Sequence, residues 1–340
     1  MIVRSKAPLR ISLAGGGTDV SPYSDIYGGA ILNMTINKYA YASIEPLDEG
    51  IIIHAIDRGE EYRYESLEAL PIDGNLDLLK SVYNRIVKDF THKPLSFRLS
   101  TYVEAPPGSG LGSSSTLVVA ILGAFTEWLK LPLGEYDIAH LSYEIERVDL
   151  GMAGGKQDQY AATFGGVNFM EFYGNDKVIV NPLRIRGSYM HELGINILLY
   201  YTQKSRLSST IIEAQQKNVR DKKSKPIEAM HKLKEQAYMM KESLLKGELH
   251  KVGEILDFGW QYKKQMAKGI SNEMIDYIYG AALANGATGG KVSGAGGGGF
   301  MMFYCPRNTR YKVEELLRGF GGTIRVSQFT MEGLTTWTIR

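Results

Sequence analysis

The 340-residue chain contains a single cysteine, Cys305, so it cannot form an internal disulfide. This excludes the class of small secreted domains held by disulfides and fits a reducing compartment. The chain also has no excess of one charge, because 39 basic residues face 37 acidic ones, for a formal net charge of +2. That balance argues against a polycation that binds nucleic acid or a membrane surface.

Long hydrophobic runs are missing as well. No uncharged apolar stretch approaches the roughly 20 residues that cross a bilayer, and the N-terminus has no continuous apolar segment of the signal-peptide kind. We therefore expect a cytoplasmic protein with no membrane partner. The composition, 44% hydrophobic and 22% charged, is ordinary for a globular chain. The length predicts roughly two domains at about 150 residues each.

Hydrophobic periodicity predicts strands and helices without strict alternation, which favours an α+β fold over a doubly wound sheet. Strands are expected in residues 1–13 (two runs broken at Ala7-Pro8), 28–46, 51–56, 62–64, 95–99, 167–173, 195–201 and 300–305, and near 323 and 335. Helices are expected in residues 76–90, 117–129, 135–149, 207–268, 273–283 and 309–317. The domain boundary is placed near residues 181–194, giving domains of 1–185 and 190–340.

What the chain has in excess is glycine, 38 residues against about 24 at a typical usage of 7%. The central cluster follows a predicted strand and leads into a predicted helix; it reads Pro106-Pro107-Gly108-Ser109-Gly110-Leu111-Gly112-Ser113-Ser114-Ser115. Amides at a helix N-terminus lack intrahelical partners, and glycine lets an anion approach them closely. The cluster predicts a phosphate-binding loop, with an ordinary turn and serine cap as the alternative. It has neither the lysine of a Walker A loop nor the third glycine of the dinucleotide fingerprint.

Two further glycine clusters flank the central one. Gly294, Gly296 and Gly299 satisfy the pattern G-x-G-x-x-G, but a strand rather than a helix is expected after them. We expect instead that this backbone closely approaches a ligand or another loop. The stretch Gly15-Gly16-Gly17-Thr18-Asp19 follows a strand that contains Arg10, and its last two side chains can bind a polyol. A β-turn capped by the aspartate is the alternative.

Phosphoryl transfer needs a divalent cation and a group close to the acceptor hydroxyl. Acidic candidates end the second predicted helix, where Glu144, Glu146 and Asp149 lie close together, and Asp158 follows after a glycine-broken loop. Spacing alone does not choose between Glu144 and Glu146. A solvated helix surface is the alternative interpretation for these carboxylates.

Taken together, the three glycine clusters resemble the motifs of the galactokinase, homoserine kinase, mevalonate kinase and phosphomevalonate kinase (GHMP) superfamily. Residues 107–114 resemble its central motif, residues 7–19 its N-terminal motif and residues 291–299 its C-terminal motif. They occur in the family order and span nearly the whole chain. The resemblance implies an N-terminal ribosomal protein S5 domain 2-like domain and a C-terminal ferredoxin-like α+β domain, with the active site in the cleft between them.

The resemblance also implies roles for individual residues. Asp158 matches the catalytic aspartate, Arg10 the catalytic cation and Glu146 the metal-binding glutamate. Ser114 would be the second ligand of Mg²⁺, and Asp19 matches a position that binds sugar hydroxyls. The phosphates of ATP would be held by Pro107, Gly108, Ser109, Gly110, Leu111, Gly112, Ser113 and Ser114.

Within the superfamily, residues 15–19 resemble the subgroup of D-glycero-D-manno-heptose 7-phosphate kinases and fucokinase-like domains. Gly16 and Gly17 stand where galactokinases carry Glu-His, which argues against galactose. The implied reaction is ATP-dependent phosphorylation of the anomeric (C1) hydroxyl of the heptose 7-phosphate to the 1,7-bisphosphate, for nucleotide-activated heptose. A fucokinase-like enzyme acting on unphosphorylated sugar and a catalytically silent sensor of sugar and ATP are the alternatives.

A phosphorylated acceptor carries its own phosphate, so it requires a second anion site besides the one for ATP. Cationic side chains are the candidates, because they form strong charge-assisted hydrogen bonds to phosphate. The candidates are Lys156, Lys204 and Arg206. Gly16, Gly17, Thr18, Asp19 and Gly296 complete the expected acceptor side. We expect a small-molecule sugar phosphate and ATP as partners, no nucleic acid, and a monomer or homodimer.

Overall fold

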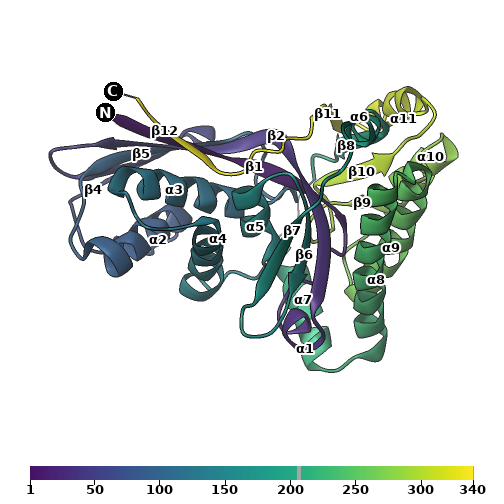
Figure 1. Cartoon of the computed structure of the whole chain (residues 1–340), viewed down its shortest axis with the longest axis horizontal. Helices are drawn as coiled ribbons and strands as arrows, with labels where there is room; N and C mark the ends of the chain where they lie inside the picture. Colours follow the sequence, from purple (N-terminus) through teal and green to yellow (C-terminus); the bar gives the residue numbers. More distant parts are fainter. Residues whose placement is uncertain (205–207, 340) are drawn as a thin grey trace.

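Two β-sheets organise the computed structural model, which describes residues 1–204 and 208–339 (Figure 1). Within this part of the chain, the larger sheet has the order β12-β1-β2-β5-β3-β4, and β6 and β7 branch from β2. Its strands are β1 (Ile2–Ala14), β2 (Gly29–Pro46), β3 (Ile51–Ala55), β4 (Glu60–Tyr64), β5 (Phe97–Val103), β6 (Val167–Phe172), β7 (Val178–Pro182) and β12 (Thr335–Ile339). The smaller sheet, in the order β11-β8-β10-β9, contains β8 (Ile197–Tyr201), β9 (Gly289–Val292), β10 (Phe300–Tyr304) and β11 (Thr323–Arg325).

Helices from the first half of the chain cover one face of the larger sheet (Figure 1). They are α2 (Asp77–Ile86), α3 (Ser113–Leu129), α4 (Glu135–Glu144) and α5 (Gln157–Phe164), and the short α1 (Tyr23–Tyr27) and the 3-10 turn Ile56–Arg58 lie in loops. The central helix, α3, is apolar from Leu117 to Phe125, so residues such as Ile121 and Phe125 are fully buried against the sheet. α2 and α4 each continue into a π-helical turn, at Val87–Thr91 and Ile145–Asp149.

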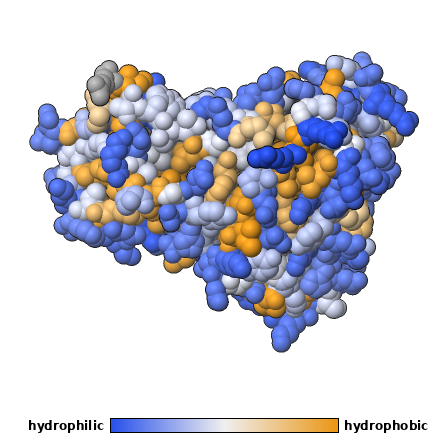
Figure 2. Space-filling view, in the orientation of Figure 1, coloured by the Kyte–Doolittle hydropathy of each residue, from blue (hydrophilic) through white to orange (hydrophobic). Residues whose placement is uncertain are grey.

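The second half of the chain supplies α6 (Gly187–Asn196), α7 (Ser208–Arg220), α8 (Ser224–Lys246), the 3-10 turn Leu249–Lys251, α9 (Val252–Met266), α10 (Glu273–Ala284) and α11 (Arg310–Arg318). The long helix α8 buries a stripe at helical spacing that includes Met230, Leu233, Ala237 and Met240. Figure 2 shows hydrophilic residues over the outer ends of the molecule and hydrophobic patches over its middle. None of the helices in residues 1–204 and 208–339 combines the length and apolar character needed to cross a bilayer.

One hydrophobic core joins the two halves of the chain. Leu9, Ile11 and Leu13 of β1 pack in the same buried cluster as Met240 of α8 and Met302 of β10. Residues Ile2–Lys6 at the start of β1 pair with β12, so this C-terminal strand belongs to the larger sheet. Arg10 alternates with these core residues along β1, which carries its side chain to the cavity described below.

Helices α1, α5 and α6 and strand β7 are absent from the predicted elements, and two predicted strands differ from the observed ones for a clear reason. β1 is one strand and is not broken at Ala7-Pro8: its pairing with β2 shifts register between Pro8 and Arg10, and proline is tolerated at such an irregularity. The strand expected from Ile195 begins at Ile197, because α6 extends to Asn196. The mixed apolar and polar residues of α6 give no clear helical period. The domain boundary near residues 181–194, with domains of 1–185 and 190–340, stays a prediction.

Candidate active site

The loop between β5 and α3 holds the central glycine cluster. Gly108, Gly110 and Gly112 have φ values of +70°, +80° and +80°, a conformation that residues with a Cβ rarely adopt. Space is short too, since a Cβ on Gly110 would lie 2.6 Å from the carbonyl oxygen of Ser293. Both the backbone conformation and the close neighbour therefore require glycine here.

The C-terminal glycine cluster packs against this loop. The amide of Phe300 donates to the carbonyl oxygen of Ser109 at 3.0 Å, and a Cβ on Gly299 would lie 2.6 Å from that oxygen. Residues 293–299 connect β9 to β10, so no helix follows them and the dinucleotide fingerprint does not apply. The expected close approach to another loop is confirmed.

Most amides of the central loop have no protein acceptor. Among the amides of residues 108–114, that of Ser109 bonds the carbonyl of Pro106 at 3.2 Å, and the others find no acceptor in the described part of the chain. Gly112 is the N-cap of α3 and provides no side-chain cap. Unpaired amides at the positive end of a 17-residue helix form a binding site for an anion.

Arg10 and Asp158 meet beside this loop. Nε of Arg10 donates to Oδ1 of Asp158 at 2.7 Å, and its second terminal nitrogen lies 2.5 Å from the same oxygen. The remaining nitrogen donates to the carbonyl of Gly110 at 2.6 Å. A Cβ on Gly112 would lie 3.1 Å from Cγ of Asp158. The loop, the cation and the aspartate are thus in contact.

Glu146 enters the cavity from the π-helical turn that ends α4. The hydroxyl of Ser114 donates to its Oε1 at 3.0 Å, and Nε2 of Gln159 donates to its Oε2 at 2.5 Å. Glu144 points elsewhere and pairs with Arg85 at 2.5 Å. The geometry separates the two glutamates that spacing left equivalent, because of the two only Glu146 lines the cavity.

On the other side of Asp158, the glycine stretch after β1 is held by Asp19. Its carboxylate accepts the amides of Gly17, Lys156 and Gln157 at 3.3, 2.9 and 3.0 Å. Burial raises the pKa of this carboxyl above its usual value, against the opposing effect of the amide of Gln157. Asp19 lines the cavity and also ties the β1 loop to the start of α5.

The other predicted residues of this loop differ in position. Gly17 lines the cavity. The hydroxyl of Thr18 is fully buried and bonds the carbonyl oxygens of Gly15 and Ala30 at 2.9 and 3.0 Å, so it holds the loop in place. Gly16 offers its carbonyl oxygen to Nζ of Lys263 at 3.1 Å.

The predicted phosphate-binding cations are not brought together. Lys156 points away from the residues that line the cavity, and its ammonium lies 2.7 Å from Asp176 and 3.8 Å from Asp25. Lys204 is exposed and does not line the cavity. Arg206 lies outside the described residues. Gly296 packs on Ile270 with a φ of +109° and is also absent from the cavity wall.

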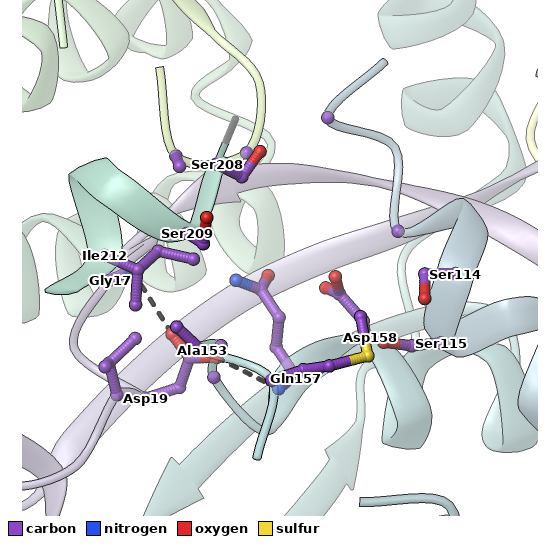
Figure 3. A pocket seen from close by; sticks show the side chains of 18 of the residues that line it. Gly17, Asp19, Ser114, Ser115, Ala153, Gln157, Asp158, Ser208, Ser209 and Ile212 are labelled. Atoms are coloured by element: carbon purple, nitrogen blue, oxygen red, sulfur yellow. Dashed lines mark hydrogen bonds between the residues drawn. The ribbon is translucent and has the colours of Figure 1, made fainter. Parts of the chain in front are cut away.

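The residues around the phosphate loop and those around the loop after β1 line one cavity of about 520 Å³. Figure 3 shows Asp158, Ser114 and Ser115 on one side, Gly17, Asp19, Ser209 and Ile212 on the other, and Gln157 between them. We call the first side the nucleotide half and the second the acceptor half. One end of the cavity therefore presents amides and a carboxylate–hydroxyl pair, and the other presents side chains from several elements.

Comparison with known proteins agrees with this geometry. Residues 77–166 match the family model of the GHMP kinases N terminal domain, and residues 240–321 that of the GHMP kinases C terminal. A D-glycero-alpha-D-manno-heptose 7-phosphate kinase of Campylobacter jejuni is 50% identical over 338 residues, 99% of each chain. The chain belongs to the GHMP kinase family. The expected α+β fold and the expected phosphotransferase with an alcohol acceptor are confirmed.

Other members of the family are similar over different extents. A crystal structure of a D-glycero-D-manno-heptose 1-phosphate kinase from Bacteriodes thetaiotaomicron has a TM-score of 0.84 and 47% identity and covers 99% of each chain. The bifunctional fucokinase/GDP-fucose pyrophosphorylase of Arabidopsis thaliana is 27% identical over 326 residues, which are 91% of this GHMP kinase and 31% of that longer protein.

Two buried lysines of this GHMP kinase were missed by the sequence reasoning. Lys263 of α9 lines the acceptor half, and burial lowers its pKa to about 8. Lys291 of β9 donates to the carbonyl of Ser12 at 2.9 Å, and burial lowers its pKa well below the usual value. Lys263 lies next to Lys264 in a polar helix, so the sequence carries no signal that one of the two is buried. Lys291 precedes a glycine cluster, which was the available clue.

Proposed function

We propose that this protein transfers the γ-phosphate of ATP to the anomeric hydroxyl of D-glycero-D-manno-heptose 7-phosphate. The observation that carries the proposal is the contact between the Arg10–Asp158 pair and the glycine loop at Gly112. An aspartate placed against a loop of unpaired amides suits an acceptor hydroxyl held next to a bound phosphate chain.

Asp158 orients the acceptor hydroxyl and accepts its proton as the phosphoryl group moves. Arg10 contacts Oδ1, whereas Oδ2 lies 3.2 Å from the place of a Cβ on Gly112 and receives no hydrogen bond from the described residues. Oδ2 is therefore the oxygen available to the hydroxyl. The Arg10 guanidinium adds positive charge where the acceptor oxygen becomes anionic, which stabilises the transition state.

Ser114 and Glu146 fit a magnesium ion. Mg²⁺ binds through one or two protein oxygens together with substrate phosphates, and this hydroxyl and carboxylate lie 3.0 Å apart in the cavity wall. Glu146 is only 1% exposed, and Arg147, its nearest cation among the described residues, is 3.7 Å away. A bound ion would neutralise charge on the phosphates of ATP. The residues 107–114 would hold those phosphates mainly through their amides.

The acceptor is the finer part of the proposal. Relatives similar over 99% of their length carry the names heptose 7-phosphate kinase and heptose 1-phosphate kinase. Both names concern a phosphorylated heptose and differ in the position of the phosphate. The anomeric hydroxyl is the proposed site of transfer, so the acceptor's own phosphate is placed on C7. Asp19 and Gln157 line the cavity and are suited to bind the sugar hydroxyls between the anomeric carbon and the phosphate on C7.

The test is ADP release from Mg-ATP with heptose 7-phosphate, free mannose, fucose, galactose and mevalonate as acceptors. We expect turnover with the heptose 7-phosphate, and a second phosphorus signal at the anomeric position in the ³¹P NMR spectrum of the product. Turnover of free fucose would support a fucokinase-like enzyme instead. Binding of sugar and ATP without ADP release would support a sensor.

We propose a cytoplasmic setting and a monomer or homodimer. Cys305 is the single cysteine of the chain and has no disulfide partner, which suits a reducing compartment. Analytical ultracentrifugation of the full chain would distinguish the two oligomeric states.

A further inference from the structure

Lys263 is a buried cation with few partners inside the protein. Its side chain reaches from α9 to the acceptor half and is 3% exposed. An ammonium has three N–H donors, and the described residues supply one acceptor, the carbonyl of Gly16 at 3.1 Å. No carboxylate in residues 1–204 or 208–339 lies within 4.0 Å of it. A charge buried in this way costs stability unless an anion completes its surroundings.

Gln215 is a second polar side chain in the same wall. It comes from α7, is 2% exposed and lines the cavity, yet its amide forms no hydrogen bond with the described residues. Its Oε1 lies 3.6 Å from the place of a Cβ on Gly17, next to the glycine that contacts Lys263. The cation and the free amide therefore flank the same two-glycine backbone.

This pair lies away from the nucleotide half. Asp158 faces Gly112 of the phosphate loop, whereas the preceding residue, Gln157, gives its amide to Asp19 on the acceptor side. Figure 3 shows Gly17 and Asp19 across the cavity from Ser114. A ligand at Gly16 and Gly17 is thus placed beyond the acceptor hydroxyl and not among the phosphates of ATP.

The other cations of the cavity wall are already near carboxylates. Arg10 is paired with Asp158, and Arg147 lies 3.7 Å from Glu146. Within the described residues, Lys263 is the cavity-lining cation left without such a partner. Asp19, the carboxylate of the same half, acts on Lys263 only from beyond 4.0 Å, and a second buried ammonium, that of Lys291, lies beside Gly16 but outside the cavity wall.

We propose that Lys263, assisted by Gln215, binds the phosphate ester that the acceptor already carries. The inference rests on the proposed function, because it needs a phosphorylated sugar. A phosphate dianion takes charge-assisted hydrogen bonds from the ammonium and neutralises the buried charge. An unphosphorylated sugar leaves that charge uncompensated, so Lys263 also selects against it.

The test compares Lys263→Met with wild type on two acceptors, heptose 7-phosphate and the same heptose without phosphate. We expect KM for the phosphorylated acceptor to rise about tenfold to a hundredfold, the value of a hydrogen bond to a charged group. KM for ATP should not change, and KM for the free heptose should fall or stay the same, because the methionine leaves no uncompensated charge. Lys263→Arg should recover part of the loss. Lys264→Met is the matched control, since this neighbour on α9 has a 31% exposed side chain and lies outside the cavity wall.

Inorganic phosphate provides an independent readout. It should compete with the phosphorylated acceptor in wild type and compete much more weakly in Lys263→Met. An equal rise of KM for both acceptors would assign Lys263 to sugar hydroxyls and overturn the proposal, as would an unchanged KM. The proposed function itself would be overturned if the wild-type protein did not phosphorylate heptose 7-phosphate and phosphorylated a free sugar.

Folding of the variant can be checked separately. Loss of a buried, uncompensated charge should leave the thermal unfolding temperature at or above that of wild type. If Lys263→Met does not fold, Gln215→Leu carries the same comparison, with a several-fold rise of KM confined to the phosphorylated acceptor. The absence of that rise would count against the subsite.

Discussion

The nucleotide half of the cavity is formed mainly by backbone amides, and the acceptor half mainly by side chains. The nucleotide half presents consecutive amides of one loop, Gly108–Ser114, at the start of one helix. The acceptor half presents side chains from the loop after β1, from α7 and from α9, which are far apart along the chain. A backbone site depends on where the chain can pass, and a side-chain site depends on which groups the fold brings together.

This difference teaches what each half tolerates. In the nucleotide half, an added Cβ is harmful even where the new side chain is inert, because neighbouring backbone fills the space. In the acceptor half, the chemical group of each side chain matters as well, although Gly17 and Gly155 also leave no room for a Cβ. Asp158, on the nucleotide side of Gln157, contacts both Arg10 of β1 and the phosphate loop at Gly112.

The largest expected effect therefore comes from Asp158. Asp158→Asn keeps the shape of the side chain and removes its ability to accept a proton, so kcat should fall at least about 100-fold. ATP affinity, measured by calorimetry, should stay near that of wild type. Asp176→Asn is the control, because this carboxylate also pairs with a buried cation, Lys156, but lies outside the cavity wall. Turnover of Asp158→Asn close to wild type would contradict the assigned role.

The second prediction concerns the carboxylate of the nucleotide half. Glu146→Gln should raise the Mg²⁺ concentration for half-maximal rate by about tenfold to a hundredfold, as expected when the surroundings of a metal ion are altered. Glu144→Gln, two residues away and paired with Arg85, should leave it unchanged. A titration of initial rate against Mg²⁺ at fixed ATP gives both values. Equal effects of the two substitutions would remove Glu146 from the metal site.

The same contrast explains what sequence could and could not predict. The phosphate loop is one contiguous segment, so its glycines, serines and following helix are visible together, and the structure brings Ser114 and Glu146 into contact. Most helices and strands also follow from hydrophobic periodicity. Lys263 is different, because its burial depends on α9 packing over the loop after β1, and no local pattern records that contact.

Lys156 shows the converse problem. Its position two residues before Asp158 suggested a phosphate ligand, and the backbone amide of Lys156 does help to build the acceptor half by bonding Asp19. Its ammonium, however, turns to Asp176 and Asp25. Proximity in sequence places a backbone near a site and leaves the direction of the side chain to tertiary packing.

A third, smaller effect tests the backbone character of the nucleotide half. Gly112→Ala combines a left-handed φ with a Cβ only 3.1 Å from Cγ of Asp158, so we expect kcat/KM for ATP to fall about tenfold. Gly59→Ala is the matched control, because Gly59 has a φ of +65° with nothing within 4 Å of its Cβ position. Both variants carry similar backbone strain, so equal losses of activity would indicate a general loss of stability.

The smallest expected effect sharpens the side-chain character of the acceptor half. Burial lowers the pKa of Lys263 to about 8, with Asp19 opposing the shift and Arg10 reinforcing it; Lys291 is the further cation beside Gly16. The ammonium is charged below that pH and loses its proton above it, so kcat/KM for heptose 7-phosphate should be flat on the acid side and fall about threefold from about pH 7.5 to about pH 8.5. In Lys263→Met the alkaline fall should disappear, whereas Lys264→Met should keep it. An identical profile in all three proteins would show that Lys263 does not bind the phosphate of the acceptor.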